Sequence, residues 1–152
     1  MKRQTLVLTA GLLMIVAADN AYAYRQSQYD LIKQGEKSCR SCDLKGADFR
    51  KVDLSGVDLA GADLTGASFA GATLSNVDLT DANLAAVDFS GAVIKNTLFV
   101  GAHLEGADLT AVDGWAVDFE AAHCDARSKL PGGWFCSGTF EVRRALWPRL
   151  PS

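Results

Sequence analysis

The stretch Cys42–Phe69 reads CDLKGADFRKVDLSGVDLAGADLTGASF and places Leu or Phe at every fifth residue. A small residue, usually Ala or Val, precedes each of them by two positions. Helices repeat near 3.6 residues and strands near 2, so neither element explains a period of five. The pattern continues to Ala126 as seventeen five-residue units, and fifteen of their central positions are Leu, Ile or Phe. Gly114 and Cys124 are the two exceptions.

A large and a small apolar residue two positions apart can both point inward from a short extended segment. The residue between them is Asp in ten of the seventeen units, which suits a position that faces water. Gly often ends the unit, as at Gly46 and Gly56, and permits the positive φ of a sharp corner. An amphipathic helix does not fit, because a five-residue spacing drifts around the whole helix surface. One unit cannot bury its own apolar side, so we expect neighbouring units to stack.

These units resemble the repeat of the pentapeptide-repeat family, A-(D/N)-L-x-x, over the 85 residues from Cys42 to Ala126. The resemblance implies an all-β fold, a right-handed quadrilateral β-helix in which four units make one coil. The seventeen units then give about four coils, with short capping segments at the ends. Residues twenty apart should stack in two inner columns rich in Phe: Phe49, Phe69, Phe89 and Leu109 in one, and Leu59, Leu79, Phe99 and Phe119 in the other.

Residues 1–23 have the pattern of a secretory signal peptide. Two basic residues precede an apolar run from Leu6 to Ala18, and Ala21-Tyr22-Ala23 fits a cleavage site after Ala23. The run is shorter than the about 20 apolar residues that span a bilayer, although an uncleaved membrane anchor is the alternative. We expect an exported protein, periplasmic or secreted, with no membrane segment after cleavage.

The remainder is expected to form three parts: an N-terminal cap over residues 24–41, the repeat over 42–126, and a C-terminal cap and tail over 127–152. Ser27-Gln28-Tyr29-Asp30 resembles a capping box and predicts a short helix over residues 27–35. Trp134 and Phe135 follow a Pro-Gly-Gly turn and are expected to cover the last coil. A second short helix is expected from Phe140 to Trp147.

Export favours disulfides, and four cysteines allow three pairings. In a stack of coils Cys42 and Cys124 lie ~19 Å apart, whereas a disulfide spans about 7 Å between Cα atoms. The expected pairs are therefore Cys39–Cys42 and Cys124–Cys136, and both segments resemble those of exported pentapeptide-repeat proteins. A redox-active C-x-x-C motif and a zinc site are the alternatives, but the sequence lacks a βαβ setting and a second C-x-x-C.

The charge pattern and the missing motifs exclude several function classes. Residues 42–126 hold fourteen acidic and four basic side chains, whereas segments 24–41 and 127–152 are net basic. An acidic body argues against nucleic-acid binding, which needs Lys and Arg opposite phosphates. The sequence shows no Ser/His/Asp arrangement, Gly-rich phosphate loop or paired-acid motif, and a stacked interior leaves no pocket. We expect no catalysis and no cofactor.

The two histidines, His103 and His123, are twenty residues apart and should stack on the outside. Asp43, Asp63 and Asn83 should continue the same column. A metal ion could bridge such a ladder. Because this outward position is polar in most units, we expect a solvated column and no metal site.

Four apolar residues occupy positions that are usually polar and form a possible interface: Val93, Leu98, Val100 and Trp115. Coverage of this surface by the C-terminal cap is an equal alternative. Leu146 and Trp147 either provide that cover or join two chains as a homodimer.

Three functions follow. The first is a noncatalytic exported scaffold or interaction protein with an unknown protein partner. The family resemblance implies the second, because its best-known members mimic duplex DNA in shape and charge and bind DNA gyrase. The export signal and the basic C-terminus disfavour that function. The third is weak metal binding through the outer column that contains His103 and His123.

Overall fold

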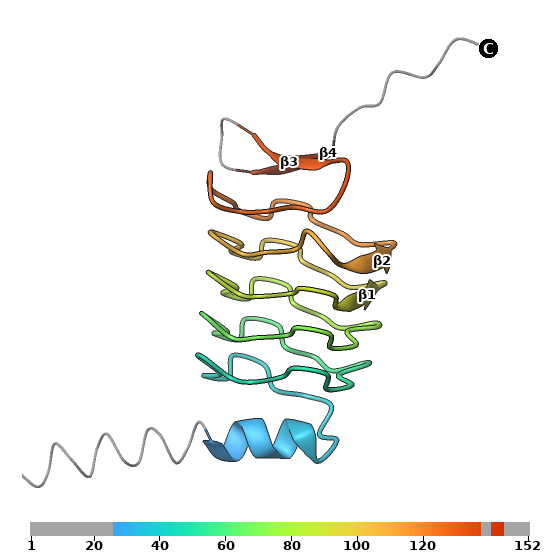
Figure 1. Ribbon diagram of the computed structural model, residues 1–152. Coiled ribbons are helices and arrows are strands. Elements are labelled where there is room, and N and C mark those ends of the chain that lie inside the picture. Colours follow the sequence, from blue (N-terminus) through green and yellow to red (C-terminus); the bar gives the residue numbers. More distant parts are fainter. Residues whose placement is uncertain (1–25, 138–140, 145–152) are drawn as a thin grey trace, which may run out of the picture.

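The computed structural model describes residues 26–137 and 141–144. The chain winds through a stack of similar turns, with a helix over residues 26–33 at one end and a hairpin at the other (Figure 1). The strands within these residues are β1 (Val93–Lys95), β2 (Asp113–Trp115), β3 (Trp134–Cys136) and β4 (Val142–Arg144). β1 and β2 pair in parallel, whereas β3 and β4 are antiparallel. The expected signal peptide, residues 1–23, lies outside the described residues.

Single backbone bridges, rather than long strands, hold the turns together. They join residues twenty positions apart in parallel, as in Asp43 with Asp63 and Asp63 with Asn83. The N–H of Leu44 donates to the carbonyl of Asp63, and the N–H of Asp63 donates to the carbonyl of Cys42, both at 2.8 Å. The chain is therefore a β-helix with a twenty-residue repeat. Its right-handed sense, four-sided section and number of coils stay predictions.

The offset changes by one residue near the C-terminal end. Asp108 pairs with Lys129, which is 21 positions away. The extra residue lies in the loop 125–128, where the Ser128 hydroxyl donates to the Leu104 carbonyl at 2.8 Å. Asp125 Oδ1 accepts a hydrogen bond from the N–H of Gly106 at 3.0 Å. The parallel backbone pairing thus reaches three residues beyond Ala126, where the five-residue pattern ends.

The interior consists of the central residues of the units. Sixteen of the seventeen are at most 1% exposed, and Gly114 is the exception. The rings of Phe49 and Phe69 stack with centroids 5.2 Å apart, as do those of Phe69 and Phe89. Phe99 stacks on its own column neighbour, Phe119, at 5.0 Å. The two Phe-rich columns expected from the sequence are therefore present.

One interior position carries a polar side chain. Thr97 stands where every other unit except the first, which has Cys42, has Ala or Val, and it is completely buried. Its hydroxyl donates to the Leu74 carbonyl at 2.5 Å, so the buried polar group is satisfied.

The corners of the stack use a left-handed backbone conformation at five-residue intervals. Gly holds about half of these positions, but Ala86 also adopts a φ of 56° and Lys51 a φ of 59°. That conformation costs a residue with a Cβ roughly 1–2 kcal/mol. Pairing between turns therefore outweighs local preference at these corners.

The N-terminal helix covers the first turn with Gln28, Tyr29 and the buried Ile32. The ring of Tyr29 packs on Phe49 at 5.1 Å, and its hydroxyl donates to the Asp48 carbonyl at 2.5 Å. The Gln28 side-chain oxygen accepts a hydrogen bond from the N–H of Asp43 at 3.2 Å. The helix already includes residue 26, so Ser27 lies inside it and the predicted capping box is wrong.

The C-terminal cap is a hairpin. Trp134 packs edge-on against Phe119 with ring centroids 4.9 Å apart, and the N–H of Val142 donates to the Ala122 carbonyl at 2.9 Å. Phe135, also expected to cover the coil, is instead 48% exposed, because it alternates with Trp134 along β3. The sequence predicted a helix from Phe140 to Trp147. This prediction is wrong over Val142–Arg144, which form the strand β4. Pairing with β3 replaces the local helix preference there. The remaining residues of that helix lie outside the described part of the chain.

The aromatic column gives a first prediction. Phe69→Ala removes a fully buried ring that stacks on two neighbours, and we expect it to lower the free energy of unfolding by about 3–5 kcal/mol. Phe69→Leu keeps most of the apolar volume and should cost less. Denaturant unfolding of the oxidised chain measures both variants. A loss below about 1 kcal/mol for the alanine variant would contradict the stacked interior.

The corner geometry gives a second prediction. Ala86→Gly removes the strain of a positive φ, so we expect it to leave stability unchanged or raise it by about 0.5–1 kcal/mol. Ala85→Gly, one residue earlier and outside the corner, should instead lower stability by about 0.5–1 kcal/mol. Thermal unfolding of this matched pair checks the corner assignment, and equal destabilisation by both changes would refute it.

Candidate functional site

The filled interior leaves the outer columns and the two ends as candidate sites. Each outward position between two buried neighbours stacks on its counterparts twenty residues away. A binding surface can therefore be described column by column.

One outer column contains both histidines. Backbone bridges connect Asn83 to His103 and His103 to His123. The two imidazole rings stack with centroids 4.8 Å apart and planes 14° from parallel, and both side chains are exposed. His103 Nδ1 lies 3.4 Å from Glu105 Oε1. The structure thus brings together the pair that the sequence singled out, with Asp43 and Asp63 further along the column.

The predicted apolar interface is divided among polar neighbours. Leu98 is 40% exposed and is bridged to Asp78 on one side and Asp118 on the other. Val93 is half-buried and pairs with Thr73 and Asp113, in a different column.

The other two residues of the predicted interface add little to an apolar patch. Val100 is half-buried, and its carbonyl accepts the N–H of Asp81 at 2.8 Å. Trp115 pairs by its backbone with Lys95, and its side chain lies outside what the structure describes. The interface stays a prediction, as does a homodimer through Leu146 and Trp147, which lie outside the described residues.

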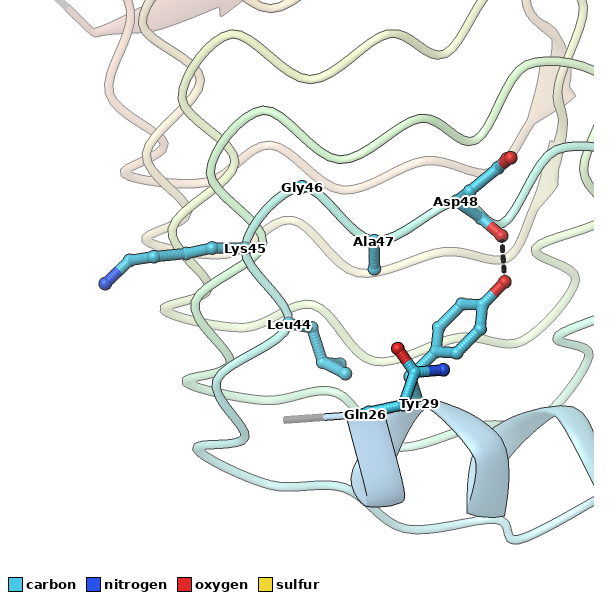
Figure 2. Close-up of a pocket in the computed structure, with 7 residues that line it drawn as sticks. All are labelled: Gln26, Tyr29, Leu44, Lys45, Gly46, Ala47 and Asp48. Carbon is cyan, nitrogen blue, oxygen red and sulfur yellow. Dashed lines mark hydrogen bonds between the residues drawn. The ribbon is translucent and has the colours of Figure 1, made fainter. Parts of the chain in front are cut away.

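A pocket of about 250 Å³ opens where the N-terminal helix meets the first turn. Figure 2 shows Gln26 and Tyr29 of the helix facing Leu44 and Ala47, with the Tyr29–Asp48 hydrogen bond at one side. The sequence does not indicate this pocket, because the docking angle of a cap helix leaves no mark in the repeat.

A second pocket, of about 410 Å³, lies at the C-terminal end beside Gly114. A Cβ on Gly114 would lie 2.4 Å from the carbonyl oxygen of Ile94, so β2 approaches β1 too closely for any side chain there. Trp134 and Arg144 line the same pocket, and the guanidinium lies 5.9 Å from the indole ring. In the sequence, the sign of this pocket is Gly114, which interrupts the series of large apolar central residues.

Two disulfides fasten the ends of the stack. Cys39 bonds to Cys42 with Cα atoms 5.5 Å apart, and Cys124 bonds to Cys136 at 5.8 Å. These are the two pairs named from the sequence, and none of the four cysteines is free. Cys124 is the last residue of an inner column and Cys136 ends β3, so this bond ties the hairpin to the stack.

Local hydrogen bonds stabilise the ionised form of several outward carboxylates. The Lys129 ammonium, together with the hydroxyl and N–H of Thr110, lowers the pKa of Asp108 to about 2. Arg127 acts in the same way on Asp125, whose pKa is also about 2. Most outward Asp residues accept the N–H two residues later, which fixes the carboxylate at the corner.

The Asp108 environment gives a third prediction. A carboxyl whose pKa is lowered by folding stabilises the folded state above the unfolded pKa of about 3.9, and this contribution disappears as pH falls through about 2. We expect Asp108→Asn to be less stable than wild type at pH 7 and the difference to vanish near pH 2. Thermal unfolding across this pH range measures it, and a pH-independent difference would contradict the assignment.

The described residues hold neither a cluster of metal ligands nor a helix that could span a membrane. Across residues 26–137 and 141–144, no three His, Cys, Asp or Glu side chains are grouped so that they could hold a metal ion. Over the same part of the chain, no helix has the length and apolar character needed to cross a membrane.

The model of the pentapeptide repeats matches residues 42–81 and 78–113, with 8 copies. No curated protein sequence matches the chain.

Solved structures similar to the chain include the following three. A pentapeptide repeat protein of the cyanobacterium Cyanothece 51142 is 19% identical over 68% of this chain and 98% of its own, with a TM-score of 0.33. One from the Arabidopsis thaliana thylakoid lumen is 26% identical over 64% and 68%, with a TM-score of 0.35. QnrB1, a plasmid-mediated fluoroquinolone resistance protein, is 19% identical over 58% and 60%, with a TM-score of 0.28.

Proposed function

Because this chain belongs to the pentapeptide-repeat family, we propose that it is an exported, noncatalytic protein that binds a partner protein. In this proposal a right-handed, four-sided β-helix of about four coils acts as a rigid support. Its acidic sides form the binding surface, and the partner presents a basic segment. The charge distribution along the stack carries the proposal.

The charges support a basic partner. Residues 52–126 contain twelve acidic side chains and one basic side chain, Lys95. Positive charges are concentrated at the two ends of the chain, where Arg40 pairs with Asp58 and Lys129 with Asp108. A surface with one sign of charge attracts an oppositely charged partner and speeds its association.

One outer column offers an apolar contact within this acidic surface. Leu98 is exposed between Asp78 and Asp118, and neighbouring turns are separated by the usual strand spacing of about 4.8 Å. A basic segment that carries one apolar side chain would meet opposite charge on both sides of Leu98. We define Asp78, Leu98 and Asp118 as the acidic docking column.

The filled interior supports a noncatalytic role. The inner columns are occupied by the chain's own side chains, and catalytic groups need a pocket that holds substrate. The pockets described above lie at the ends, outside the acidic docking column.

A charge-reversal experiment tests the docking column and is our fourth prediction. We expect crosslinking and pull-down with wild type to capture a partner that is lost with Asp78→Lys/Asp118→Lys. Asp53→Lys/Asp113→Lys makes the same change of charge in another column and should retain the partner. Equal loss from both variants, or retention by both, would contradict the docking column.

Export is tested separately by cell fractionation. We expect a form shortened by residues 1–23 in the periplasm or the medium. Full-length protein that remains in the cytoplasm would contradict export.

Gyrase binding is the second candidate function, because an acidic rod can imitate the charge of duplex DNA. The expected signal peptide and the basic C-terminal segment favour the first function over it. A gyrase supercoiling assay separates the two. We expect no effect of the protein, whereas inhibition or protection of gyrase would establish the second function instead.

A further inference from the structure

We propose that His103 and His123 form a solvent-facing two-histidine site for one divalent transition-metal ion, with Cu²⁺ bound most tightly. This inference concerns a different outer column from the acidic docking column and does not depend on the proposed partner. It goes beyond the expectation of a solvated column, because the structure shows how the two rings lie.

The backbone holds the two imidazoles at a spacing that suits chelation. The bridge between His103 and His123 places them on adjacent turns, with ring centroids 4.8 Å apart. Two nitrogens bound to one ion at about 2.0–2.1 Å lie roughly 3 Å from each other. The rings must therefore tilt out of their parallel stack, because the in-plane lone pairs of stacked imidazoles do not meet at one ion, and the two nitrogens must come closer by roughly 2 Å. Both side chains are exposed, so rotation about their χ angles can supply this movement.

Glu105 favours the tautomer of His103 that can bind the ion. His103 Nδ1 lies 3.4 Å from Glu105 Oε1, and a metal-binding histidine commonly donates its other ring N–H to a carboxylate. When Nδ1 carries the proton, Nε2 is left with a lone pair for the ion. The carboxylate also adds negative charge beside a divalent cation.

The surroundings contain no stronger soft ligand. All four cysteines are in disulfides, so no thiolate competes for the ion. The described residues hold no group of three or more potential ligands, so water must complete the coordination. Two imidazoles and water favour Cu²⁺ over Ni²⁺ and Zn²⁺ by the usual order of divalent affinities. Mg²⁺ prefers oxygen ligands and should not bind at this pair.

The rest of the column helps to keep the pair in place. Asn83 bridges to His103 on one side, and Glu141 bridges to His123 on the other. The Glu141 carboxylate already pairs with Arg143, so it belongs to the hairpin rather than to the proposed site. The paired backbone on both sides fixes the separation of the two Cα atoms before any ion arrives.

Calorimetry and electron paramagnetic resonance test the site, which gives our fifth prediction. Metal-free, oxidised full chain without an affinity tag is titrated with CuCl₂, NiCl₂, ZnSO₄ and MgCl₂. We expect one Cu²⁺ per chain, weaker Ni²⁺ and Zn²⁺ binding, and no heat from Mg²⁺ at the same concentrations. The resonance spectrum of the Cu²⁺ form should show coupling to two imidazole nitrogens.

Variants of exposed residues assign the ligands without disturbing the fold. His103→Gln and His123→Gln should each weaken Cu²⁺ binding at least tenfold, and the spectrum should lose one nitrogen. Glu105→Gln should weaken binding less, with both nitrogens kept. Asn83→Ala, in the same column but outside the pair, should bind like wild type.

Several outcomes would overturn the site. Absence of Cu²⁺ binding by wild type would do so, as would binding that survives His103→Gln/His123→Gln, which would place the ion on the acidic columns. A spectrum with one coupled nitrogen in wild type would exclude chelation by the pair. The docking-column variant, Asp78→Lys/Asp118→Lys, keeps both histidines, so loss of the partner protein in that variant does not change the expected Cu²⁺ binding. Either proposal can therefore fail while the other holds.

Discussion

Backbone pairing between residues twenty positions apart is the constraint on which the other features depend. Each turn satisfies its N–H and C=O groups with the turns on either side, as in the bonds between Leu44, Asp63 and Cys42. Turns at the strand spacing of about 4.8 Å place like side chains on one another. The inner rings therefore stack at 5.0 to 5.2 Å, and the outer histidines at 4.8 Å.

The same constraint explains why each end needs a cap and why a surface column can bind a partner. At the first turn, Gln28 and Tyr29 supply the partners that a preceding turn would have given to Asp43 and Asp48. At the last turn, Val142 bonds to Ala122 and the disulfide from Cys124 holds the hairpin. Between the caps, side chains cannot leave their columns, so charges and rings are presented at fixed spacing.

The sequence predicted the features that follow from its period. The inner columns, the Phe stacks and the pairing of His103 with His123 all follow from counting twenty residues.

The sequence did not predict the features that depend on contacts outside the twenty-residue period. The 21-residue offset at Lys129 arises from hydrogen bonds of Asp125 and Ser128 with the previous turn. The prediction of a second helix was wrong because local helix propensity takes no account of the pairing of β4 with β3. The cap pockets depend on docking angles, which no repeat encodes.

The most direct test of this account is the backbone register, measured by through-space contacts in nuclear magnetic resonance. We expect cross-peaks between backbone protons of residues twenty apart, such as Asp63 with both Asp43 and Asn83. Contacts of Asp63 only with residues three or four positions away, or with residues at a different offset, would contradict it.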